Sequence, residues 1–266
     1  MVAAAGLAAM FAMAPGAALG AQAQEVQAQE AQAPEERSLK DAFARNQVAA
    51  ETALYETADG GYVFVLDRTR EPPLLQFRNS FEVFVMSRVP ASRGDEILRT
   101  DAGDDLLRIT PLGAVTLYPR EHPMGLPAAR LGSAAPLPEA LPDVDLLAAL
   151  EHLRTAADGA DIDAPRAASQ AATLAAFGAT AEPDPARGDL LADAARVTAE
   201  ALREIKESQN GSARVASLTR VQFVYGENPD AQFAGGVLTV QVVSGAGYAG
   251  RPSSLRIEDS LLSEYN

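Results

Sequence analysis

A glycine-rich segment near the C-terminus carries the pattern closest to a known ligand-binding motif. Gly245, Gly247 and Gly250 match G-x-G-x-x-G, between an expected strand and an expected helix. In dinucleotide-binding proteins such glycines let the backbone approach a pyrophosphate, and a second parallel strand supplies the acid that binds the ribose. The sequence ends at Asn266, too soon for that second strand. We therefore expect neither a nucleotide nor any other cofactor.

The same glycines could instead form a small anion-binding site. Glycine amides beside a helix N-terminus can converge on a phosphate or carboxylate, and arginine and serine side chains follow them in the sequence. A flexible turn that joins strand to helix is the alternative interpretation. The candidate anion-binding residues are Gly245, Gly247, Gly250, Arg251, Ser253 and Arg256.

Two other polar motifs have simpler structural explanations. Arg93-Gly94-Asp95 matches the Arg-Gly-Asp tripeptide of adhesion proteins. A glycine between charged residues before a strand is also typical of a turn, which is the interpretation we adopt. Three carboxylates lie close together in the sequence, at Asp158, Asp161 and Asp163. The segment lacks the glycine and the distal glutamate that an EF-hand calcium loop requires. Helix capping and solvation explain these acids better than calcium binding does, so no metal site is expected.

No catalytic group can be named from the sequence. His122 and His152 are far apart and lack H-E-x-x-H spacing, so each is expected to be a surface or internally satisfied histidine. The adjacent acids Asp104–Asp105 and Glu258–Asp259 could supply an acid and a base, but adjacent acids in an acidic protein are usually solvated. The sequence contains no G-x-S-x-G, S-x-x-K or P-loop pattern. The sequence therefore assigns no catalytic residues.

Composition and charge limit the possible functions. The 266 residues include no cysteine, which excludes disulfides and thiolate chemistry. The formal net charge is −14, and lysine occurs only at positions 40 and 206. Without a basic stripe, neither nucleic acid nor an anionic membrane surface is expected as a partner. The sequence leaves the oligomeric state open.

The first 23 residues have the composition of a secretory signal peptide. An alanine-rich apolar run precedes Ala21-Gln22-Ala23, which has the small-x-small pattern of a cleavage site, although no basic residue follows Met1. Proline and glycine interrupt the run, which disfavours the alternative of a buried or membrane helix. Residues 24–36 should form a disordered tether. No later segment is apolar enough to span a membrane, so we expect a periplasmic or secreted protein without a transmembrane segment.

Five short apolar segments predict an antiparallel β-meander. They are rich in β-branched and aromatic residues and are separated by clusters of glycine, aspartate and proline. An amphipathic helix that starts at Leu39 and ends before Asp59 should pack against this sheet, and the proline-rich residues 119–142 should form an extended connection. The predicted strands cover residues 62–66, 81–86, 96–100, 106–110 and 114–118.

The rest of the chain predicts acidic helices followed by further β structure. Helical patterns begin near Asp143 or Asp145, at Asp163 and at Asp189, and the second of them stops at Gly178. Two strands, over residues 218–225 and 237–243, then predict a hairpin. Because a lone hairpin is marginally stable in water, we expect it to join the first sheet. A short helix over residues 253–265 follows the glycine-rich segment.

The sequence therefore predicts an α+β fold. An antiparallel β-meander or barrel-like sheet is completed by a C-terminal hairpin and carries an acidic helical insertion. The expected segments are a signal peptide (1–23), a disordered tether (24–36) and a single α+β domain (37–266). Within this domain, the β part covers 61–132, the helical insertion 139–209, and the C-terminal hairpin and helix 214–266.

Several motifs together resemble an uncharacterised family of exported bacterial proteins, a domain of unknown function. The resemblance covers residue 50 to the end, which leaves the signal peptide and tether outside it. It implies an exported, bacterial, single-domain protein and supplies no catalytic residues. The motifs are Phe64-Val-Leu-Asp67-Arg68, Arg93-Gly94-Asp95, Leu107-Arg-Ile-Thr110-x-Leu112-Gly113-Ala114-x-Thr116, Pro123-x-Gly125-x-Pro127-Ala128 and Gly250-Arg-Pro-Ser-Ser254 with Arg256-Ile257.

Two function classes agree with these observations. The first is a non-catalytic envelope protein, a binding or scaffolding module that offers a sheet face or edge to another envelope protein or a cell-wall component. The second is an envelope hydrolase that acts on cell-wall or polysaccharide substrate through carboxylates. A deep cleft that contains paired carboxylates would favour the hydrolase, whereas a barrel with a filled interior would favour binding.

Export should remove residues 1–23, because Ala21-Gln22-Ala23 is the best small-residue site behind the apolar run. The intact mass of protein isolated from the periplasm or the medium measures this directly. A retained Met1, or protein confined to the cytoplasm, would contradict the signal-peptide interpretation.

Overall fold

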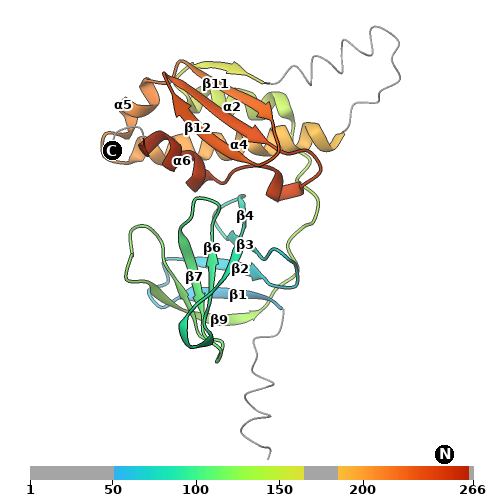
Figure 1. Ribbon diagram of the computed structural model, residues 1–266, viewed down its shortest axis with the longest axis vertical. Coiled ribbons are helices and arrows are strands. Elements are labelled where there is room, and N and C mark those ends of the chain that lie inside the picture. The colour runs from blue at the N-terminus through green and yellow to red at the C-terminus, as the bar shows by residue number, and fades with distance from the viewer. Residues whose placement is uncertain (1–50, 165–184, 264–266) are drawn as a thin grey trace, which may run out of the picture. The chain divides into compact units, whose positions relative to one another are not determined.

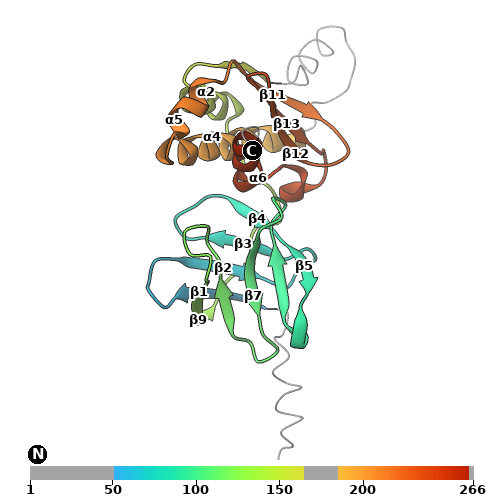
Figure 2. The ribbon, with the colours of Figure 1, turned by 60° about the vertical axis from the view of Figure 1, so that its left-hand side comes forward.

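The computed structural model of the protein describes residues 51–164 and 185–263. Within these residues, two β-sheets are associated with separate hydrophobic cores (Figures 1 and 2). Nine strands form the first sheet, and four strands with four α-helices form the rest. The fold is α+β with a barrel-like antiparallel sheet, as predicted. The predicted signal peptide and tether lie outside the described residues.

The first sheet is a nearly closed antiparallel barrel. Its strand order is β4-β3-β2-β1-β9-β8-β7-β6-β5, so the pairing of β1 with β9 joins two halves of a meander. The end strands β4 and β5 are separated in the chain by Met86 alone, which brings the two sheet edges together. The strands are β1 (Thr52–Thr57), β2 (Val63–Asp67), β3 (Leu74–Phe77), β4 (Val83–Val85), β5 (Ser87–Pro90), β6 (Glu96–Arg99), β7 (Asp105–Ile109), β8 (Val115–Leu117) and β9 (Leu126–Ser133).

Alternating side chains fill the barrel. Phe64 and Leu66 of β2 are buried, whereas Val65 between them is only partly so. This two-residue period is that of a strand with one face toward a core. Tyr55 of β1 stacks on Phe64 with ring centroids 5.5 Å apart, which adds a specific aromatic contact to the burial of both rings.

All five predicted strands are confirmed, within a few residues, as β2, β4, β6, β7 and β8. The helix predicted between Leu39 and Asp59 is wrong where it can be compared, because Thr52–Thr57 is strand β1. Residues 39–50 lie outside the described part of the chain. Ala53, Tyr55 and Thr57 are buried at alternate positions, which is the period of a strand rather than of a helix.

The connection predicted over residues 119–142 contains strand β9. Most side chains of β9 are exposed, so the strand shows no apolar alternation that a sequence reading could detect. Its backbone nevertheless pairs with β1 on one side and with β8 on the other. Main-chain hydrogen bonding, and not side-chain burial, therefore joins the two halves of the barrel.

The second sheet has the order β10-β11-β13-β12. Strands β10, β11 and β13 run parallel, and β12 pairs antiparallel with β13. Two predictions are therefore wrong: β11 and β13 do not form a hairpin, and they do not complete the barrel. Strand β12, which was not predicted, lies between β11 and β13 in the chain and runs in the opposite direction to both. Because of this extra strand, β11 and β13 can run parallel. The strands are β10 (Asp161–Asp163), β11 (Arg220–Tyr225), β12 (Asp230–Ala234) and β13 (Val237–Val242).

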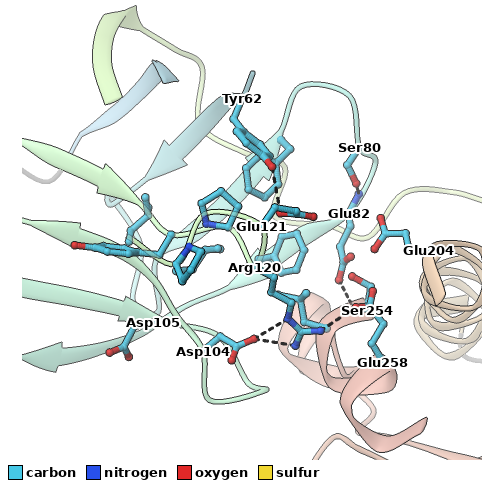
Figure 3. Close-up of a pocket in the computed structure, with 18 of the residues that line it drawn as sticks. Tyr62, Ser80, Glu82, Asp104, Asp105, Arg120, Glu121, Glu204, Ser254 and Glu258 are labelled. Atoms are coloured by element: carbon cyan, nitrogen blue, oxygen red, sulfur yellow. Dashed lines mark hydrogen bonds and ion pairs between the residues drawn. The ribbon is translucent and has the colours of Figure 1, made fainter. Parts of the chain in front are cut away.

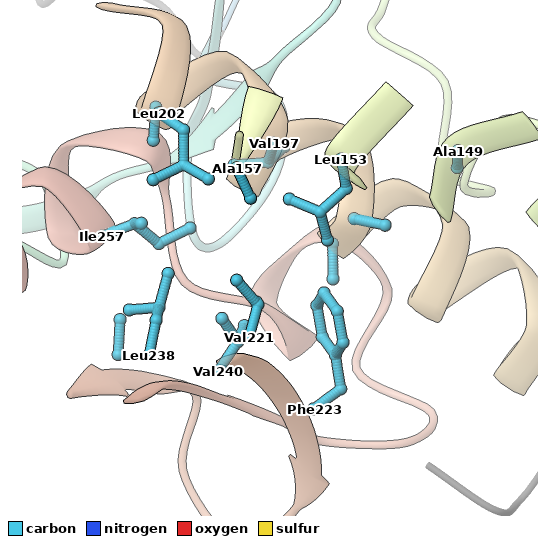
Figure 4. Packing of buried hydrophobic residues seen from close by; sticks show 14 of the residues in the cluster. Ala149, Leu153, Ala157, Val197, Leu202, Val221, Phe223, Leu238, Val240 and Ile257 are labelled. Atoms are coloured by element: carbon cyan, nitrogen blue, oxygen red, sulfur yellow. The ribbon is translucent and has the colours of Figure 1, made fainter. Parts of the chain in front are cut away.

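Helices supply the apolar partner that this sheet needs. Leu153, Leu202 and Ile257, from three different helices, belong to one buried cluster with Val221 and Val240 of the sheet (Figure 4). The apolar faces of β11 and β13 are thus buried without the barrel. The helices are α2 (Leu146–Ala156), α4 (Pro185–Glu207), α5 (Gly211–Ala216) and α6 (Ser254–Ser263), with short 3-10 turns η1 (Ser92–Gly94) and η2 (Gly247–Gly250).

Most helix predictions are correct in type but shifted in place. Asp145 caps α2 by accepting two backbone amides of the first turn at 2.8 and 3.2 Å. Helix α4 begins at Pro185 and not after Asp189. Helix α6 begins at Ser254, one residue later than predicted, and the last two residues of the helix predicted over 253–265 lie outside the described part of the chain. Strand β10 occupies the expected start of the helix predicted over residues 163–178, whose remainder lies outside the described residues.

A buried arginine connects the helices to the barrel. Arg251, between β13 and α6, donates to Asp193 of α4, and its Nη1 lies 3.4 Å from Oε1 of Glu82, just before β4. Each of these three side chains is only 2% exposed. Glu82 also accepts the backbone amide of Ser254 at 3.0 Å. Buried charges are stable only with such partners. The three side chains therefore hold α4, the start of α6 and the segment before β4 together.

Replacing Arg251 with methionine should lower the free energy of unfolding by about 3–5 kcal/mol, because it leaves two buried carboxylates without their counter-charge. The matched control is Arg256→Met, which removes a partly exposed ion pair with Asp230 and should cost about 1 kcal/mol or less. Urea unfolding of the two variants measures both values. Equal losses would contradict the structural role given to Arg251.

Candidate functional site

A pocket of about 850 Å³ lies between the barrel and the helices α4 and α6 (Figure 3). Its walls come from strands β3, β4, β6 and β7, from the loop between β8 and β9, and from the two helices. The barrel side carries aromatic rings together with acids such as Asp104 and Asp105, and the helix side is acidic. The pocket therefore offers both aromatic and acidic groups to one ligand.

Four aromatic rings contribute to the barrel side. The ring of Phe77 lies 6.0 Å from those of both Tyr62 and Phe84. Tyr118 adds a fourth ring from the end of β8. Gly125 lets the β8–β9 loop close against Tyr118, because its φ is +80° and a Cβ there would lie 2.6 Å from the Tyr118 ring.

Three carboxyl groups gather on the helix side. Glu82 precedes β4, Glu204 lies in the last turns of α4, and Glu258 lies on α6 (Figure 3). Ser254 and Glu258 are four residues apart, so they share one face of α6. The bond from the Ser254 amide to Glu82 fixes the start of α6 and directs this face toward the pocket.

Two of these carboxyl groups hold protons more tightly than ordinary glutamates do. Burial raises the pKa of Glu82 to about 7, against the opposing effects of Arg251 and the Ser254 amide. Burial and the neighbouring Glu204 together raise the pKa of Glu258 to about 9, against the opposing effect of Arg120. Two carboxyl groups in hydrogen-bonding contact cannot both ionise readily, which is a second reason why Glu258 keeps its proton.

The two oxygens of Glu258 have different surroundings. Oε2 accepts from Nη1 of Arg120 at 3.0 Å, whereas the buried Oε1 has no donor among the described residues. A proton on Oε1 gives that oxygen a partner, because it can then donate to Glu204. The residue as a whole is 8% exposed.

The pocket has an excess of negative charge. Arg120 contacts Asp104 and Asp259 as well as Glu258, so its own charge is more than balanced. Arg203 pairs with Glu200. The lining comprises seven acidic side chains against three basic ones, which favours a cationic over an anionic ligand: Glu82, Asp104, Asp105, Glu121, Glu200, Glu204 and Glu258 against Arg108, Arg120 and Arg203.

The structure does not bring the predicted anion-binding residues to one point. Arg251 is engaged by Asp193 and Glu82, as described above. The amide and hydroxyl of Ser253 both donate to Asp101, the amide at 2.8 Å, and Nε of Arg256 donates to Asp230 at 2.8 Å. Internal carboxylates thus occupy the three polar side chains, and binding of an external anion stays a prediction.

The three glycines of the motif have separate roles in the backbone. Gly245 and Gly247 have positive φ angles of 80° and 54°, and Gly247 begins the turn η2. Gly250 is buried, and a Cβ there would lie 2.4 Å from the carbonyl oxygen of Val243. A close turn between β13 and α6 accounts for all three glycines.

Two of the other motifs have the structures expected of them. Arg93-Gly94-Asp95 lies in and beside η1 with positive φ at Arg93 and Gly94, which confirms the turn. His122 and His152 are both exposed.

The three acids of the possible calcium loop are not gathered on one ligand. Asp158 pairs with Lys206, and Asp161 with Arg220. Among residues 51–164 and 185–263, no group of three or more histidine or acidic side chains is arranged to hold a metal ion.

Sequence reasoning missed the groups that make the pocket. Glu258 was expected to be solvated beside Asp259, and that expectation is wrong because Glu258 is buried against α4 and the barrel. Glu82 and Glu204 belong to no motif. Nothing in the sequence around them predicts that they lie close to Glu258 in the folded chain. Only the packing of α4 and α6 against the barrel unites them.

Comparison with known families assigns the chain to one of them. The sequence model of the family described as a domain of unknown function (DUF4908) matches residues 13–261. The protein belongs to this family. The match begins well before residue 50, so the resemblance inferred from the motifs alone is too short at its N-terminal end.

The other comparisons add no relative. No curated protein and no solved structure matches the chain significantly. In the described part of the chain, no helix combines the length and the apolar character needed to cross a membrane.

Replacing Glu258 with glutamine should change how stability depends on pH. The folded protein keeps the proton of Glu258 up to about pH 9, whereas the unfolded chain loses it near 4.5. The wild type therefore loses stability as pH rises between these values, and the variant lacks this loss. Melting curves should give similar Tm values at about pH 5 and a Tm at least about 3 °C higher for the variant at about pH 9.

The exposed Glu151 of α2 provides the control, since Glu151→Gln removes the same charge at the surface. Its Tm should follow the wild type across the whole pH range. A difference between wild type and Glu258→Gln that stays constant with pH would show that Glu258 does not keep its proton in the folded state.

Proposed function

We propose that this protein is a non-catalytic binding protein of the bacterial cell envelope, and that its ligand is a small amphipathic molecule held in the pocket between the barrel and the helices. The observation that carries the proposal is the pocket itself. Its volume of about 850 Å³ falls within the range of about 300–1,000 Å³ found for small-molecule sites. Its combination of aromatic walls and a few polar groups is also typical of such sites.

The packing inside the barrel places the space for a small molecule at the end of the barrel. Its interior is packed with side chains such as Phe64, Leu75 and Leu107, so the space for a ligand lies at the barrel end and not inside it. Phe77 and Phe84 face this space and offer apolar surface, while the helix side offers hydrogen-bonding groups. An amphipathic ligand matches both sides.

Export, if it occurs as the N-terminal residues predict, would place the pocket in the periplasm or outside the cell. The ligand would then be a free small molecule or the end of a larger envelope component, such as another envelope protein or a cell-wall polymer. The acidic lining disfavours nucleic acid as that partner.

A hydrolase is the second candidate, because Glu258 carries a proton beside Glu204 inside the pocket. This pair is in hydrogen-bonding contact, closer than the separation of about 5–5.5 Å of retaining glycosidases. It is nearer to the shared-proton arrangement of aspartic proteases. Release of reducing ends or new amines from cell-wall polymer, lost in Glu258→Gln, would favour this candidate over binding alone.

The neutral fluorophore N-phenyl-1-naphthylamine should bind the wild-type protein at one site and fluoresce more strongly in it. The variant Ala91→Trp places a large side chain in the pocket lining and should weaken binding at least about tenfold by occupying the space. Leu147→Trp, at a 78% exposed position of α2, is the control and should bind normally. The absence of a bound probe in wild type, or equal affinity in the two variants, would contradict a ligand in this pocket.

A further inference from the structure

We propose that the Glu204–Glu258 carboxyl pair is a binding site for a primary ammonium group, and that the ligand of the pocket is an amine with an aromatic or aliphatic body. This inference rests on the proposed function and specifies the ligand's chemistry. Its basis is a buried carboxyl oxygen that no protein N–H or hydroxyl reaches, on a residue that lines the pocket together with acidic and aromatic side chains.

That oxygen is Oε1 of Glu258. The other oxygen of this carboxyl group is held by Arg120, and no protein donor in the described chain reaches Oε1. Buried polar atoms are nearly always hydrogen-bonded, and in the free protein the carboxyl proton on Oε1 meets this need by donating to Glu204. Because Glu258 lines the pocket, a ligand donor can take the place of that proton. An ammonium group carries three N–H donors and no acceptor, which suits a site made of carboxyl oxygens.

Glu204 makes the site selective for a cation. Its carboxylate faces Glu258 from α4, and two such groups in contact need a positive charge between them. In the free protein that charge is a proton. An ammonium group that donates to both carboxylates supplies the charge and the hydrogen bonds together.

The charged groups around the pair agree with this assignment. Glu258 is faced by Arg120 from the β8–β9 loop, by Glu82 from the start of β4 and by Glu204 from α4, and Asp259 follows it on α6. Arg120 is the only cation among these, and three acids share it. The pair therefore keeps a negative potential that favours a further cation.

The remaining guanidinium groups of the lining give no comparable site for an anion. Arg108 pairs with Asp95, and Arg203 with Glu200. An incoming carboxylate or phosphate would have to displace these internal partners, whereas an ammonium group displaces only a proton.

The aromatic side defines the rest of the ligand. Phe84 and Leu255 line the pocket together with Glu82 and Glu258, so the apolar wall continues to the carboxyl pair. A ring or alkyl chain attached to the ammonium group can lie against this wall, and the aromatic faces also attract the cation itself. Methylammonium has the charge without the body, so it should bind much more weakly than a larger amine.

Binding exchanges one cation for another. The amine enters as R–NH₃⁺, its N–H groups donate to the two carboxylates, and the proton of Glu258 leaves to the buffer. Each binding event thus releases about one proton. Affinity should rise with pH until the amine itself loses its proton, because the bound proton and the ligand compete for the same oxygens.

Isothermal titration calorimetry with three related probes tests this inference. The probes are 2-(2-naphthyl)ethylamine, its neutral analogue 2-(2-naphthyl)ethanol, and methylammonium. The naphthyl amine should bind at least about tenfold more tightly than the alcohol, as charge-assisted hydrogen bonds require. Titrations in phosphate and in HEPES, which differ in ionisation enthalpy, should show the release of about one proton with the amine and none with the alcohol.

Two isosteric variants locate the site. Glu258→Gln and Glu204→Gln should each reduce the affinity for the amine to about that for the alcohol, and should leave alcohol binding unchanged. The control Glu151→Gln should bind the amine as the wild type does, since it removes the same charge from an exposed position.

The outcomes separate this inference from the proposed function. Equal binding of amine and alcohol, in wild type and variants, would overturn the ammonium site and leave the pocket as an apolar binding site. Amine binding without proton release, or unaffected by both variants, would also overturn it. Failure of all three probes and of N-phenyl-1-naphthylamine would overturn both proposals.

Discussion

The burial of Arg251 with Glu82 and Asp193 is the interaction on which the described structure depends. These three charges come from segments far apart in the chain, and each is nearly inaccessible to water. A buried charge without its partner is strongly unfavourable, so the barrel, α4 and the start of α6 must come together as one arrangement. The ions give the interface a unique geometry that apolar contacts alone would define less sharply.

The same cluster creates the pocket. Glu82 binds Arg251 and the first amide of α6, which sets the direction of that helix. Glu258, one turn later, then contacts Glu204 and Arg120 in the lining of the pocket. Structural and ligand-facing carboxyl groups are therefore neighbours, and the acidity of the helices becomes concentrated where the barrel offers its aromatic side chains.

Local patterns predicted the parts of the fold that local forces determine. The five strands with clear apolar runs, the Asp145 cap and the terminal helix follow from alternation, capping chemistry and amphipathicity. Strand β9 was missed because its side chains are mostly exposed, and β11 and β13 were read as a hairpin because direction within a sheet is not encoded in a strand's own residues.

Local sequence patterns do not predict the pocket and its carboxyl groups. Arg251 was singled out for its charge, but its partners, 58 and 169 residues away, are recognisable only after folding. Glu204 and Glu258 are ordinary acids on the surfaces of two helices until the helices meet. The residue types near Gly250 therefore predict an anion site. In the folded chain, the polar side chains there bind carboxylates of the protein itself.

The most direct test of this account is a ¹³C NMR titration of the glutamate side-chain carboxyl carbons, with the Glu258 signal identified by its loss in Glu258→Gln. The account predicts that this carboxyl group titrates far above its ordinary value, at about 9, and that 2-(2-naphthyl)ethylamine ionises it at neutral pH. A Glu258 signal that titrates near 4.5, the ordinary value for glutamate, and does not respond to the amine would contradict the account.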